Sequence, residues 1–580
     1  MYRKAVGAVE HVFVSRLRGG AFQAPEEVDS ALTADSSQPV VAVGDGGLVL
    51  IAFINGESLY VVTRTGAAAP WSEATKLADG AGNPSLAVSI HGKGYLAFTA
   101  AGAGGHDVRA AYYHGGHWAL APTALDAVPG EDAGAGLGRP RVAACGDGVG
   151  IVVWGEAGHI YSRRVWASAP SVVYEQADVP TVSGWRELSA DQPEIASGDD
   201  SSYANIVWHE VIGNGVFAQS RVLMRRLRGS RYESLATPDG LRTPAAEGAV
   251  SPQIAESDYS DGFITSARDA SNQVYATFLK FGGVSDALVR VDSLASVTPP
   301  HAVTTTNGLF SGLVAWQHDP GPSGVPDVRF RLSEGNGFGP ETVASSPALG
   351  PTDASRGLFA AGDFEGDVVI AWVQGIGAST QIVTAQLWHP PAGFAPIGKS
   401  GYVRTARPVV AWSPAGQQWG TVTYTVSVDG SVVAQTTSTA LRLPALGEGP
   451  HRWQVTAANQ AGAATAAATV SLFVDRIAPT LSFTVAGPMR ARSRLRLRPR
   501  YADLPPTGLP AADASGVSAV TVDWGDGTRA RLPAGASHTY ARPGRYRVTV
   551  SVRDRAGNAA TLTRALTIAT PTKSKPRKRK

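Results

Sequence analysis

Short apolar runs recur seven times along the first two-thirds of the chain, and each ends at an equivalent position. Successive run ends lie 45 to 58 residues apart, which is the length of one four-stranded propeller blade. The run ends are Phe53, Phe98, Trp154, Trp208, Ser266, Trp316 and Trp372. Closely packed blades need bulky residues on their inner strands. The pattern predicts a β-propeller of about seven blades, with Ser266 marking a weak blade or a space that another group fills.

Within each repeat the pattern predicts short strands joined by tight turns. A turn rich in Gly and Asp, such as 44–47 or 146–148, separates the first apolar strand from the core strand. Read as calcium loops, these turns lack a regular run of oxygen ligands, so hairpin chemistry explains them better and we expect no cofactor. With 66 Gly and 38 Pro in 580 residues, the class is all-β. The single cysteine, Cys145, is expected to be a buried apolar residue.

The amino terminus predicts an incomplete first blade. Residues 9–29 have the pattern of the outer half of a blade, with no inner half ahead of them. The first residues also lack the apolar stretch of a signal peptide. We therefore expect a protein that is extracellular or on the cell surface, whose export signal lies upstream of this start; the alternative is a soluble protein inside the cell. The predicted propeller spans residues 1–398.

The repeat layout resembles that of the sialidase-like propellers of exported bacterial proteins. It lacks the Ser-x-Asp-x-Gly-x-Thr-Trp signature of those proteins, the WD dipeptides and the kelch double glycines. The resemblance therefore implies the general propeller shape and transfers no active site.

A different pattern begins after residue 398. Short alternating strands around Trp412, Tyr424 and Trp453 predict a β-sandwich over residues 399–476. This segment resembles a fibronectin type III, Ig-like module, in which these three aromatic residues would be core. No apolar run in the chain is long enough to span a bilayer.

A second sandwich is predicted over residues 477–570, and here the motif is more specific. The segment 522–528 reads Val-Asp-Trp-Gly-Asp-Gly-Thr, followed by His-Thr-Tyr and a Pro-Gly turn. It closely resembles the polycystic kidney disease (PKD) domain, which implies an extracellular Ig-like module that spaces or binds. The motif residues, which hold a turn rather than do chemistry, are Asp523, Trp524, Gly525, Asp526, Gly527, His538, Tyr540 and Gly544.

Basic residues gather at two places near the carboxyl end. Six arginines at every second position from Arg490 to Arg500 would share one face of a strand. Six more basic residues lie in the segment 571–580, which we expect to be a disordered tail. The stripe is either a solvated edge strand or, together with the tail, a contact for an anionic cell-wall polymer. No motif accompanies the charge that would indicate specific nucleic-acid binding.

Polar residues that follow the run ends are the candidates for a site. In a propeller, the loop after the second strand and the loop into the next blade lie on one face, so these residues are expected to converge around the axis. Carboxylates with a histidine and an arginine can do acid and base chemistry on a glycosidic bond. The alternative is that loops in water are simply polar. The candidates are Glu57, Glu156, Glu210, Asp269, Asp319, His209, His318 and Arg268, with Gln374 beside them.

Two functions follow from these observations. The first is a monomeric, non-enzymatic exported or cell-surface protein, whose propeller binds a glycan or a protein and whose Ig-like modules act as a stalk. The second is a propeller glycoside hydrolase or lyase that acts on an extracellular polysaccharide. An intracellular scaffold is a third reading, supported only by the missing signal peptide. The first is preferred, because zinc-protease, nucleophile-elbow and phosphate-loop motifs are all missing from the sequence.

Overall fold

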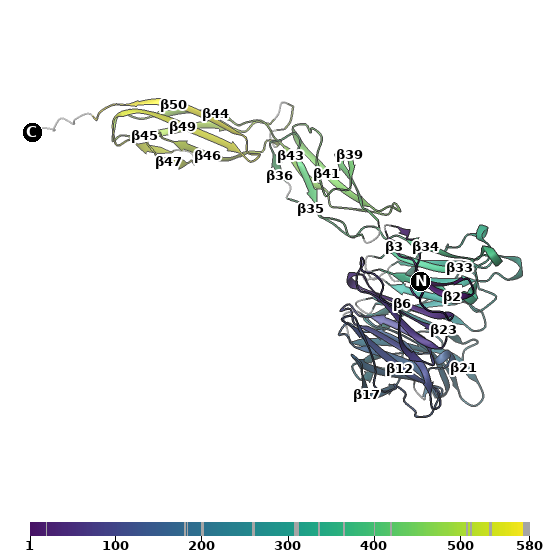
Figure 1. The fold of residues 1–580 in the computed structure, drawn as a ribbon. Coiled ribbons are helices and arrows are strands. Elements are labelled where there is room, and N and C mark those ends of the chain that lie inside the picture. Colours follow the sequence, from purple (N-terminus) through teal and green to yellow (C-terminus); the bar gives the residue numbers. More distant parts are fainter. Residues whose placement is uncertain are drawn as a thin grey trace, which may run out of the picture. The chain divides into compact units, whose positions relative to one another are not determined.

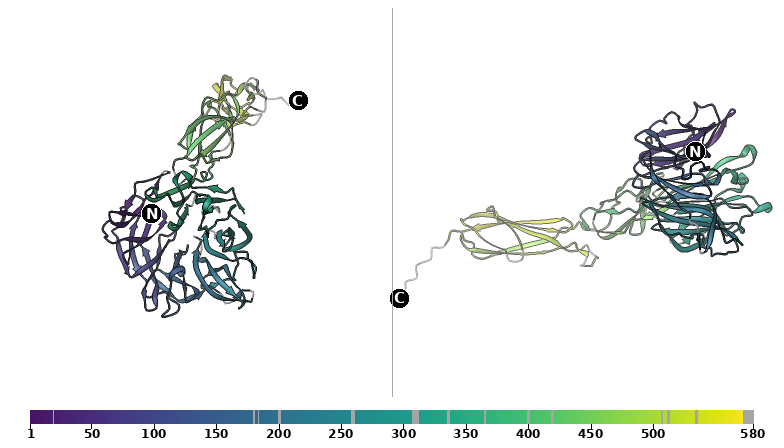
Figure 2. Two further views of the ribbon diagram at one scale, coloured as in Figure 1. Left: turned by 90° about the vertical axis from the view of Figure 1, so that its right-hand side faces the viewer. Right: turned by 90° about the horizontal axis from the view of Figure 1, so that it is seen from below.

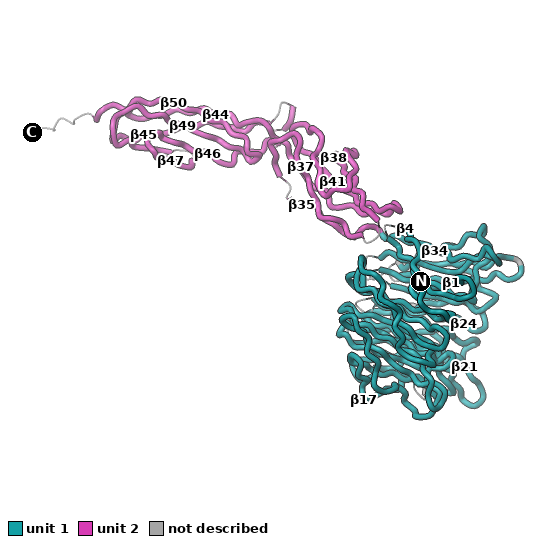
Figure 3. Tube along the Cα trace, in the orientation of Figure 1, with its two compact units in different colours: residues 1–389 teal, residues 390–580 magenta. Residues whose placement is uncertain are grey.

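A computed structural model gives the fold of the chain, which is built from β-strands (Figure 1). It describes residues 1–571 except 19, 179–180, 183, 199–201, 258–260, 307–311, 335–336, 364–365, 399–400, 418–419, 506–507, 511–512 and 533–535. The described residues contain no α-helix. Their helical elements are short 3₁₀ turns, none of which is long and apolar enough to cross a membrane. They form two compact units, which we call the propeller unit (1–389) and the sandwich unit (390–580) (Figure 3).

The propeller unit consists of successive antiparallel sheets that follow one another around a common axis (Figure 2). Most sheets pair their strands in chain order, as expected for propeller blades. The first four sheets are β1 (Tyr2–Val6), β2 (Val9–Val14) and β5 (Glu26–Glu27); β6 (Ser36–Gly44), β7 (Leu48–Asn55), β8 (Ser58–Arg64) and β9 (Thr75–Asp79); β10 (Ala81–Val88), β11 (Gly94–Gly102), β12 (Gly105–His114) and β13 (His117–Leu120); and β14 (Arg141–Ala144), β15 (Gly150–Glu156), β16 (His159–Trp166) and β17 (Ala169–Gln176).

Four further sheets complete the described part of this unit. They are β18 (Thr181–Val182), β19 (Trp185–Ala196), β20 (Tyr203–Gly213), β21 (Ala218–Arg228) and β22 (Arg231–Tyr232); β23 (Ala249–Glu256), β24 (Gly262–Arg268), β25 (Val274–Lys280) and β26 (Gly283–Arg290); β27 (Ala302–Thr306), β28 (Gly312–His318), β29 (Asp327–Glu334), β30 (Gly337–Phe338) and β31 (Thr342–Val343); and β32 (Leu358–Gly362), β33 (Val368–Gln374) and β34 (Gln381–Leu387). A short pair, β3 (Leu17–Arg18) and β4 (Ala21–Phe22), stands apart. Because the first and last sheets have three strands each, the number of blades stays a prediction.

Short 3₁₀ turns connect some of these strands. They are η1 (Asp45–Gly47), η2 (Gly136–Gly138), η3 (Gly321–Ser323), η4 (Pro347–Leu349), η5 (Ala354–Arg356) and η6 (Gly377–Ser379).

The predicted run ends are core residues. Phe53, Trp154 and Trp208 are fully buried, and the other run ends are nearly so, Ser266 included. Tyr275 of β25 lies opposite Ser266 in the strand register. Cys145 is buried as expected, and this burial raises the pKa of its thiol to about 12.

The amino-terminal sheet begins earlier than the sequence pattern predicts. Strand β1 (Tyr2–Val6) pairs antiparallel with β2, with Arg3 opposite Val12. The predicted start of the incomplete blade at residue 9 is therefore wrong, because the sheet already includes residues 2–6. The strand was missed because β1 is largely exposed and carries Arg3 and Lys4, so it lacks an apolar run.

The sandwich unit holds two Ig-like modules in succession. The first contains the sheets β35 (Pro396–Ile397), β37 (Val409–Trp412) and β40 (Ala440–Arg442), and β36 (Gly401–Val403), β43 (Val470–Val474), β41 (Gly449–Ala458), β38 (Thr423–Val428) and β39 (Ser431–Thr436), with β42 (Ala464–Ala466) on β41. The second contains β44 (Thr480–Ala486), β45 (Arg494–Ala502) and β48 (Ser537–Thr539), and β47 (Arg529–Arg531), β46 (Val517–Asp523), β49 (Gly544–Asp554) and β50 (Ala559–Ile568).

The boundary between the units falls at residues 389 and 390 rather than at 398 and 399. Phe394, which lies within the predicted propeller range 1–398, packs on Tyr424 of the first sandwich with ring centroids 5.8 Å apart. Strand β35 pairs with β37, so Pro396 lies opposite Trp412. The segment therefore completes the first sandwich, whose core holds the predicted Trp412, Tyr424 and Trp453.

The arginine stripe is shorter than expected. Arg494, Arg496, Arg498 and Arg500 are exposed on β45, while Leu495 and Leu497 point into the core. Arg490 and Arg492 precede the strand, and Arg492 has φ +62°, so the alternation does not extend to them. Strand β45 is also not a free edge, because it lies between β44 and β48. The basic tail falls outside the described residues.

Candidate functional site

The residue two positions after three of the run ends has a structural role: it accepts a hydrogen bond from the indole N–H of Trp154, Trp208 or Trp372. Glu156 follows Trp154, and its carboxylate accepts hydrogen bonds from the Trp154 indole N–H at 2.7 Å and from the backbone N–H groups of Ala127 and Val128 at 2.9 and 2.6 Å. Only 2% of Glu156 is exposed. A buried carboxylate with three donors is bonded as a structural anchor and is not presented to a substrate.

The same arrangement recurs in other sheets. The Trp208 indole donates to Glu210 at 2.7 Å, and the Trp372 indole donates to Gln374 at 3.1 Å. The Gln374 amide donates in turn to the carbonyls of Ser346 and Gly350. Glu210 differs in one respect, because its second oxygen has no hydrogen-bond partner. Its burial, with a smaller contribution from nearby Asp178, raises the pKa of Glu210 to about 7.

The other histidine and arginine candidates are mostly buried as well. Arg268 is 5% exposed, donates to the Asp239 carbonyl at 3.0 Å and lies over the Tyr275 ring. His318 is 4% exposed and has Asp327 as its ion-pair partner at 3.3 Å. His209 contacts Asp191 at 2.6 Å. These side chains connect neighbouring strands.

The remaining acidic candidates lie at the surface. Asp269 accepts a hydrogen bond from the Gly248 backbone at 2.7 Å, and Asp319 accepts one from Gly321 at 2.9 Å. Glu57 is exposed in the β7–β8 turn. Within the described residues, no hydrogen bond or ion pair joins two of the acidic candidates. Their role in catalysis therefore stays a prediction.

A second recurring hydrogen bond was missed by the sequence reading. The backbone N–H at the start of the third strand donates to an aspartate that follows the fourth strand, as Val12 does to Asp29 at 3.0 Å and Ile160 does to Asp178 at 2.9 Å. Asp126 and Asp239 accept the equivalent bonds. Each aspartate lies 17 or 18 residues after its donor, and aligning the repeats on this spacing would have revealed it.

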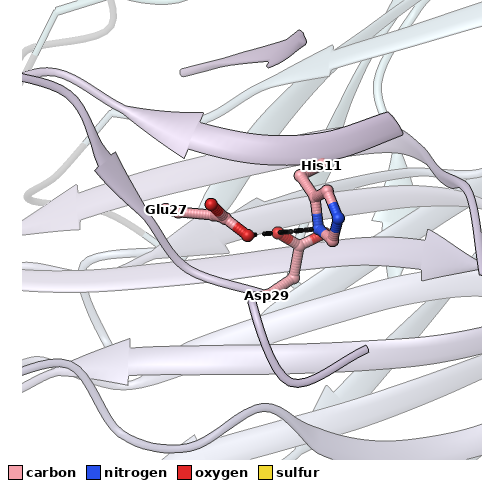
Figure 4. A group of neighbouring side chains, drawn as sticks. All are labelled: His11, Glu27 and Asp29. Carbon is pink, nitrogen blue, oxygen red and sulfur yellow. Dashed lines mark hydrogen bonds and ion pairs between the residues drawn. The ribbon is translucent and has the colours of Figure 1, made fainter. Parts of the chain in front are cut away.

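One copy of this arrangement carries a histidine and a second carboxylate. His11 Nδ1 lies 3.3 Å from both Glu27 and Asp29, so one ring nitrogen faces two carboxylates (Figure 4). These three residue types could hold a metal ion. Both oxygens of Asp29 are already bonded, to the backbone of Val12 and to the Ser36 hydroxyl. The His11 imidazole therefore joins a hydrogen-bond network in which the protein itself supplies the partners of Asp29.

An equivalent group around Asp178 also places a histidine beside two carboxylates, and here the pKa of one carboxyl is strongly raised. His159 Nδ1 lies 2.7 Å from Asp178 and 3.1 Å from Glu187. Burial, followed by a hydrogen bond and repulsion from Asp178, raises the pKa of Glu187 to about 9. Repulsion from Glu210 raises the pKa of Glu187 further. We call Asp178, Glu187 and Glu210, with His159, the acid cluster.

The predicted PKD motif forms an exposed turn next to a buried tryptophan. Trp524 is 2% exposed and stacks on His538, while the Tyr540 hydroxyl donates to the Trp524 carbonyl at 2.7 Å. Asp526 contacts His538 Nε2 at 2.7 Å, which holds the stacked ring in place. Gly525 has φ +78°, and a Cβ there would meet the Arg547 carbonyl oxygen at 2.5 Å, so only glycine fits.

Comparison with known proteins agrees with this motif. Residues 508–569 match the family model of the PKD domain, so the chain contains a PKD domain. A PKD domain structure from Vibrio anguillarum Epp is 20% identical and covers 16% of this chain and 98% of its own, with a TM-score of 0.13. No curated protein matches the chain.

Two other solved structures are similar to larger parts of the chain. Fibronectin(III)-like modules of Clostridium thermocellum CbhA are 11% identical and cover 31% of this chain and 95% of their own, with a TM-score of 0.23. An α-L-arabinanase from Penicillium chrysogenum, complexed with arabinobiose, is 9% identical and covers 53% of this chain and 93% of its own, with a TM-score of 0.33. At these TM-scores the likenesses carry no functional argument.

Proposed function

We propose that this chain is a non-enzymatic, extracellular or cell-surface binding protein. Its propeller unit recognises a glycan or a protein, and its two Ig-like modules act as a spacer. A PKD domain is typical of extracellular proteins, which supports the location. The protein acts as a monomer and does not bind a specific nucleic acid.

The observation that carries this proposal is the bonding of Glu156. The residue that the sequence pattern offers for acid and base chemistry has both carboxylate oxygens engaged with N–H donors of the protein. A general acid or base needs a lone pair or a proton within reach of the substrate. Because the oxygens of Glu156 already accept hydrogen bonds within the protein, recognition is favoured over catalysis.

The binding surface that we infer is an exposed apolar tip beside the acid cluster. Leu188, Val216 and Phe217 are 60%, 77% and 63% exposed. Leu188 and the Phe217 backbone both border Gly213, because a Cβ there would meet them at 2.7 and 3.2 Å. Leu188 follows Glu187 directly in β19. An apolar tip next to polar groups suits a sugar, which has an apolar face and a rim of hydroxyls.

The test is a glycan-array screen with the full chain, followed by affinity measurement with the best ligand. We expect Phe217→Ala to weaken binding at least about tenfold, which is the effect of about 1.4 kcal/mol of lost contact. Phe359→Ala is the matched control, because Phe359 is 65% exposed on β32, and it should bind as the wild type does. No binding to any glycan or surface protein, or equal losses in both variants, would contradict the proposal.

An anionic polymer of the cell wall is a further partner that we propose for the four arginines of β45. Their guanidinium groups are exposed on one face, which suits contact with repeated phosphates or carboxylates. Binding of a polyanion such as teichoic acid should weaken steeply with added salt. Replacement of Arg496 and Arg498 by serine should remove that binding and leave glycan binding by the propeller unit unchanged; binding that survives the replacement would contradict this role.

The acid cluster supports a second candidate function, a glycoside hydrolase or lyase. Strongly raised carboxyl pKa values gather at catalytic sites, and Glu187 and Glu210 have pKa values raised to about 9 and about 7. If this reading holds, the full chain releases sugars from a polysaccharide, and Glu187→Gln and Glu210→Gln each lower the rate at least about a hundredfold. A rate that is the same in these variants and in the wild type would exclude it.

A further inference from the structure

Three carboxylates meet where the two Ig-like modules join. Asp475 directly follows β43, the last strand of the first module, whereas Asp503 follows β45 and Asp554 ends β49 in the PKD module. One carboxylate oxygen from each residue lies within 4.8 Å of the others. Asp475 and Asp554 are 3% and 1% exposed. We call these residues the junction triad.

Backbone bonds fix the triad in this arrangement. Asp475 accepts a hydrogen bond from the Ile477 backbone, and its own backbone N–H donates to the Val403 carbonyl at 2.9 Å. Asp503 accepts from Gly516 at 2.6 Å. The carboxylate of Asp554 accepts from the backbone of Gly557 and Asn558 and from the Asn558 amide. The same Asn558 amide donates to the Asp475 carbonyl at 2.8 Å, which ties the linker to the PKD module.

Two oxygens of the triad are left without a hydrogen bond. They are Oδ2 of Asp475 and Oδ1 of Asp503, and both are shielded from solvent. Within the described residues, no lysine, arginine or histidine forms an ion pair with any of the three carboxylates. The three carboxylates therefore lie close together with no basic side chain of the described residues paired to them. An orphaned buried carboxylate oxygen is costly unless a cation satisfies it.

We propose that the junction triad binds one calcium ion. The ligand atoms are hard carboxylate oxygens, which calcium prefers, and the triad offers no soft nitrogen or sulfur ligand. Carboxylate oxygens within 4.8 Å of one another are close enough to share one ion. Calcium accepts irregular arrangements of oxygen ligands, whereas magnesium demands a near-ideal octahedron and gives up its water reluctantly, so calcium is the better fit. Backbone carbonyls and water would complete its six to eight ligands.

The ion would fix the linker that joins the two modules. Asp475 belongs to the linker, and Asp503 and Asp554 belong to the PKD module, so a shared ion bridges the two. A spacer made of two modules is stiffer when its joint is held by a metal than by the Asn558 bonds alone. This role of the joint rests on the proposed spacer function, but calcium binding itself does not.

The test is calcium binding by the full chain, measured by titration calorimetry and by thermal unfolding. One ion should bind per chain, with a dissociation constant in the range of about 10⁻⁴ to 10⁻³ M, which is typical of extracellular modules. At a hundredfold excess over this constant, calcium should raise the melting temperature of the sandwich unit by about 5 to 10 °C relative to EDTA. Magnesium should produce a smaller shift.

Variants separate a metal site from a general structural role. Asp475→Asn and Asp503→Asn should each remove the calcium-dependent shift, and in EDTA they should melt no lower than the wild type, because repulsion is relieved. Glu448→Gln is the control, since Glu448 pairs with the neighbouring Arg476 and lies outside the triad; it should keep the shift. A wild type that binds no calcium at about 10 mM, or variants that keep the full shift, would overturn the proposal. Failure of glycan binding would not affect it.

Discussion

Two buried carboxylates of the propeller unit have more hydrogen-bond donors than two carboxylates of the junction triad in the sandwich unit. In the propeller unit, Glu156 and Asp239 are surrounded by donors: Asp239 receives two bonds from Arg221 and two from backbone N–H groups. In the sandwich unit, Asp475 and Asp503 each keep one oxygen with no donor. The first kind of carboxylate is part of the fold. The second kind is incomplete without something that the chain does not supply.

This difference changes how the acidic residues of the chain are read. A carboxylate next to a recurring strand end is a poor guide to a site when the fold provides its partners. The number of unsatisfied oxygens is a better guide, because leaving a buried polar group unpaired costs about 1 to 3 kcal/mol.

The largest effect is expected from Asp239→Ala. Arg221 and Asp239 are 1% and 0% exposed, and their bidentate contact has distances of 2.7 and 2.9 Å. Removal of the carboxylate leaves a buried guanidinium without its charge partner, which costs about 3 to 5 kcal/mol. Urea unfolding of the propeller unit should report this loss. A loss of stability below about 1 kcal/mol would contradict the view that the hydrogen bonds to Asp239 are part of what stabilises the fold.

A pH titration gives the next largest effect. The pKa of Glu210 is raised by burial to about 7 from 4.5, so the folded unit holds a proton that the unfolded chain releases above pH 4.5. The stabilisation from this proton is complete below about pH 4.5 and is lost as the pH rises through 7. The propeller unit should therefore lose about 2 to 3 kcal/mol between pH 5 and pH 8 at this residue.

Glu210→Gln removes this titration and serves as its control. Thermal unfolding of the variant between pH 5 and pH 8 should show a flatter dependence than the wild type. An unchanged slope would show that Glu210 is not the group that carries the proton.

A smaller effect is expected from Glu156→Gln. The amide keeps one oxygen as an acceptor but turns an N–H₂ group toward the donors of Trp154, Ala127 and Val128. At least one buried N–H then lacks an acceptor, which costs about 1 to 2 kcal/mol. Binding of the best glycan ligand should not change. A large loss of glycan affinity with unchanged stability would return Glu156 to the list of site residues.

The smallest effect is expected from Glu57→Ala. Glu57 is exposed in a turn, and no hydrogen bond or ion pair to its side chain occurs in the described structure. Chemical denaturation should show a change within about 0.5 kcal/mol, which is usual for surface substitutions. Glu57 lies four residues after its run end, in a turn, whereas Glu156 lies two residues after its run end and is still on the strand, so the two variants compare an exposed turn carboxylate with a buried strand carboxylate.

The sequence predicted the core of each repeat well, because an apolar run ended by Trp or Phe has a single reasonable place in a sheet. The prediction was wrong for the residues that follow the run end on the same strand. Glu156 was assigned to a loop, although β15 continues to this residue. Alternation places Trp154 and Glu156 on the same face of the strand, and the burial of one predicts the burial of the other. That rule was available from the sequence and would have corrected the assignment.

The junction triad could not have been predicted in this way. Asp475, Asp503 and Asp554 lie far apart in the sequence, and only the folding of the second sandwich brings them together. The PKD motif, by contrast, is local: Trp524, Gly525 and Asp526 form one turn whose glycine requirement can be read directly. Local turn chemistry is visible in a sequence, whereas a site assembled from strand ends is not.

Scanning calorimetry of the full chain in calcium and in EDTA tests the contrast between the two units most directly. Calcium should raise only the transition of the sandwich unit, because the carboxylates around His11 and His159 in the propeller unit already have a histidine and backbone donors as partners. A calcium-dependent shift of the propeller transition, or the absence of any shift in the sandwich transition, would contradict it.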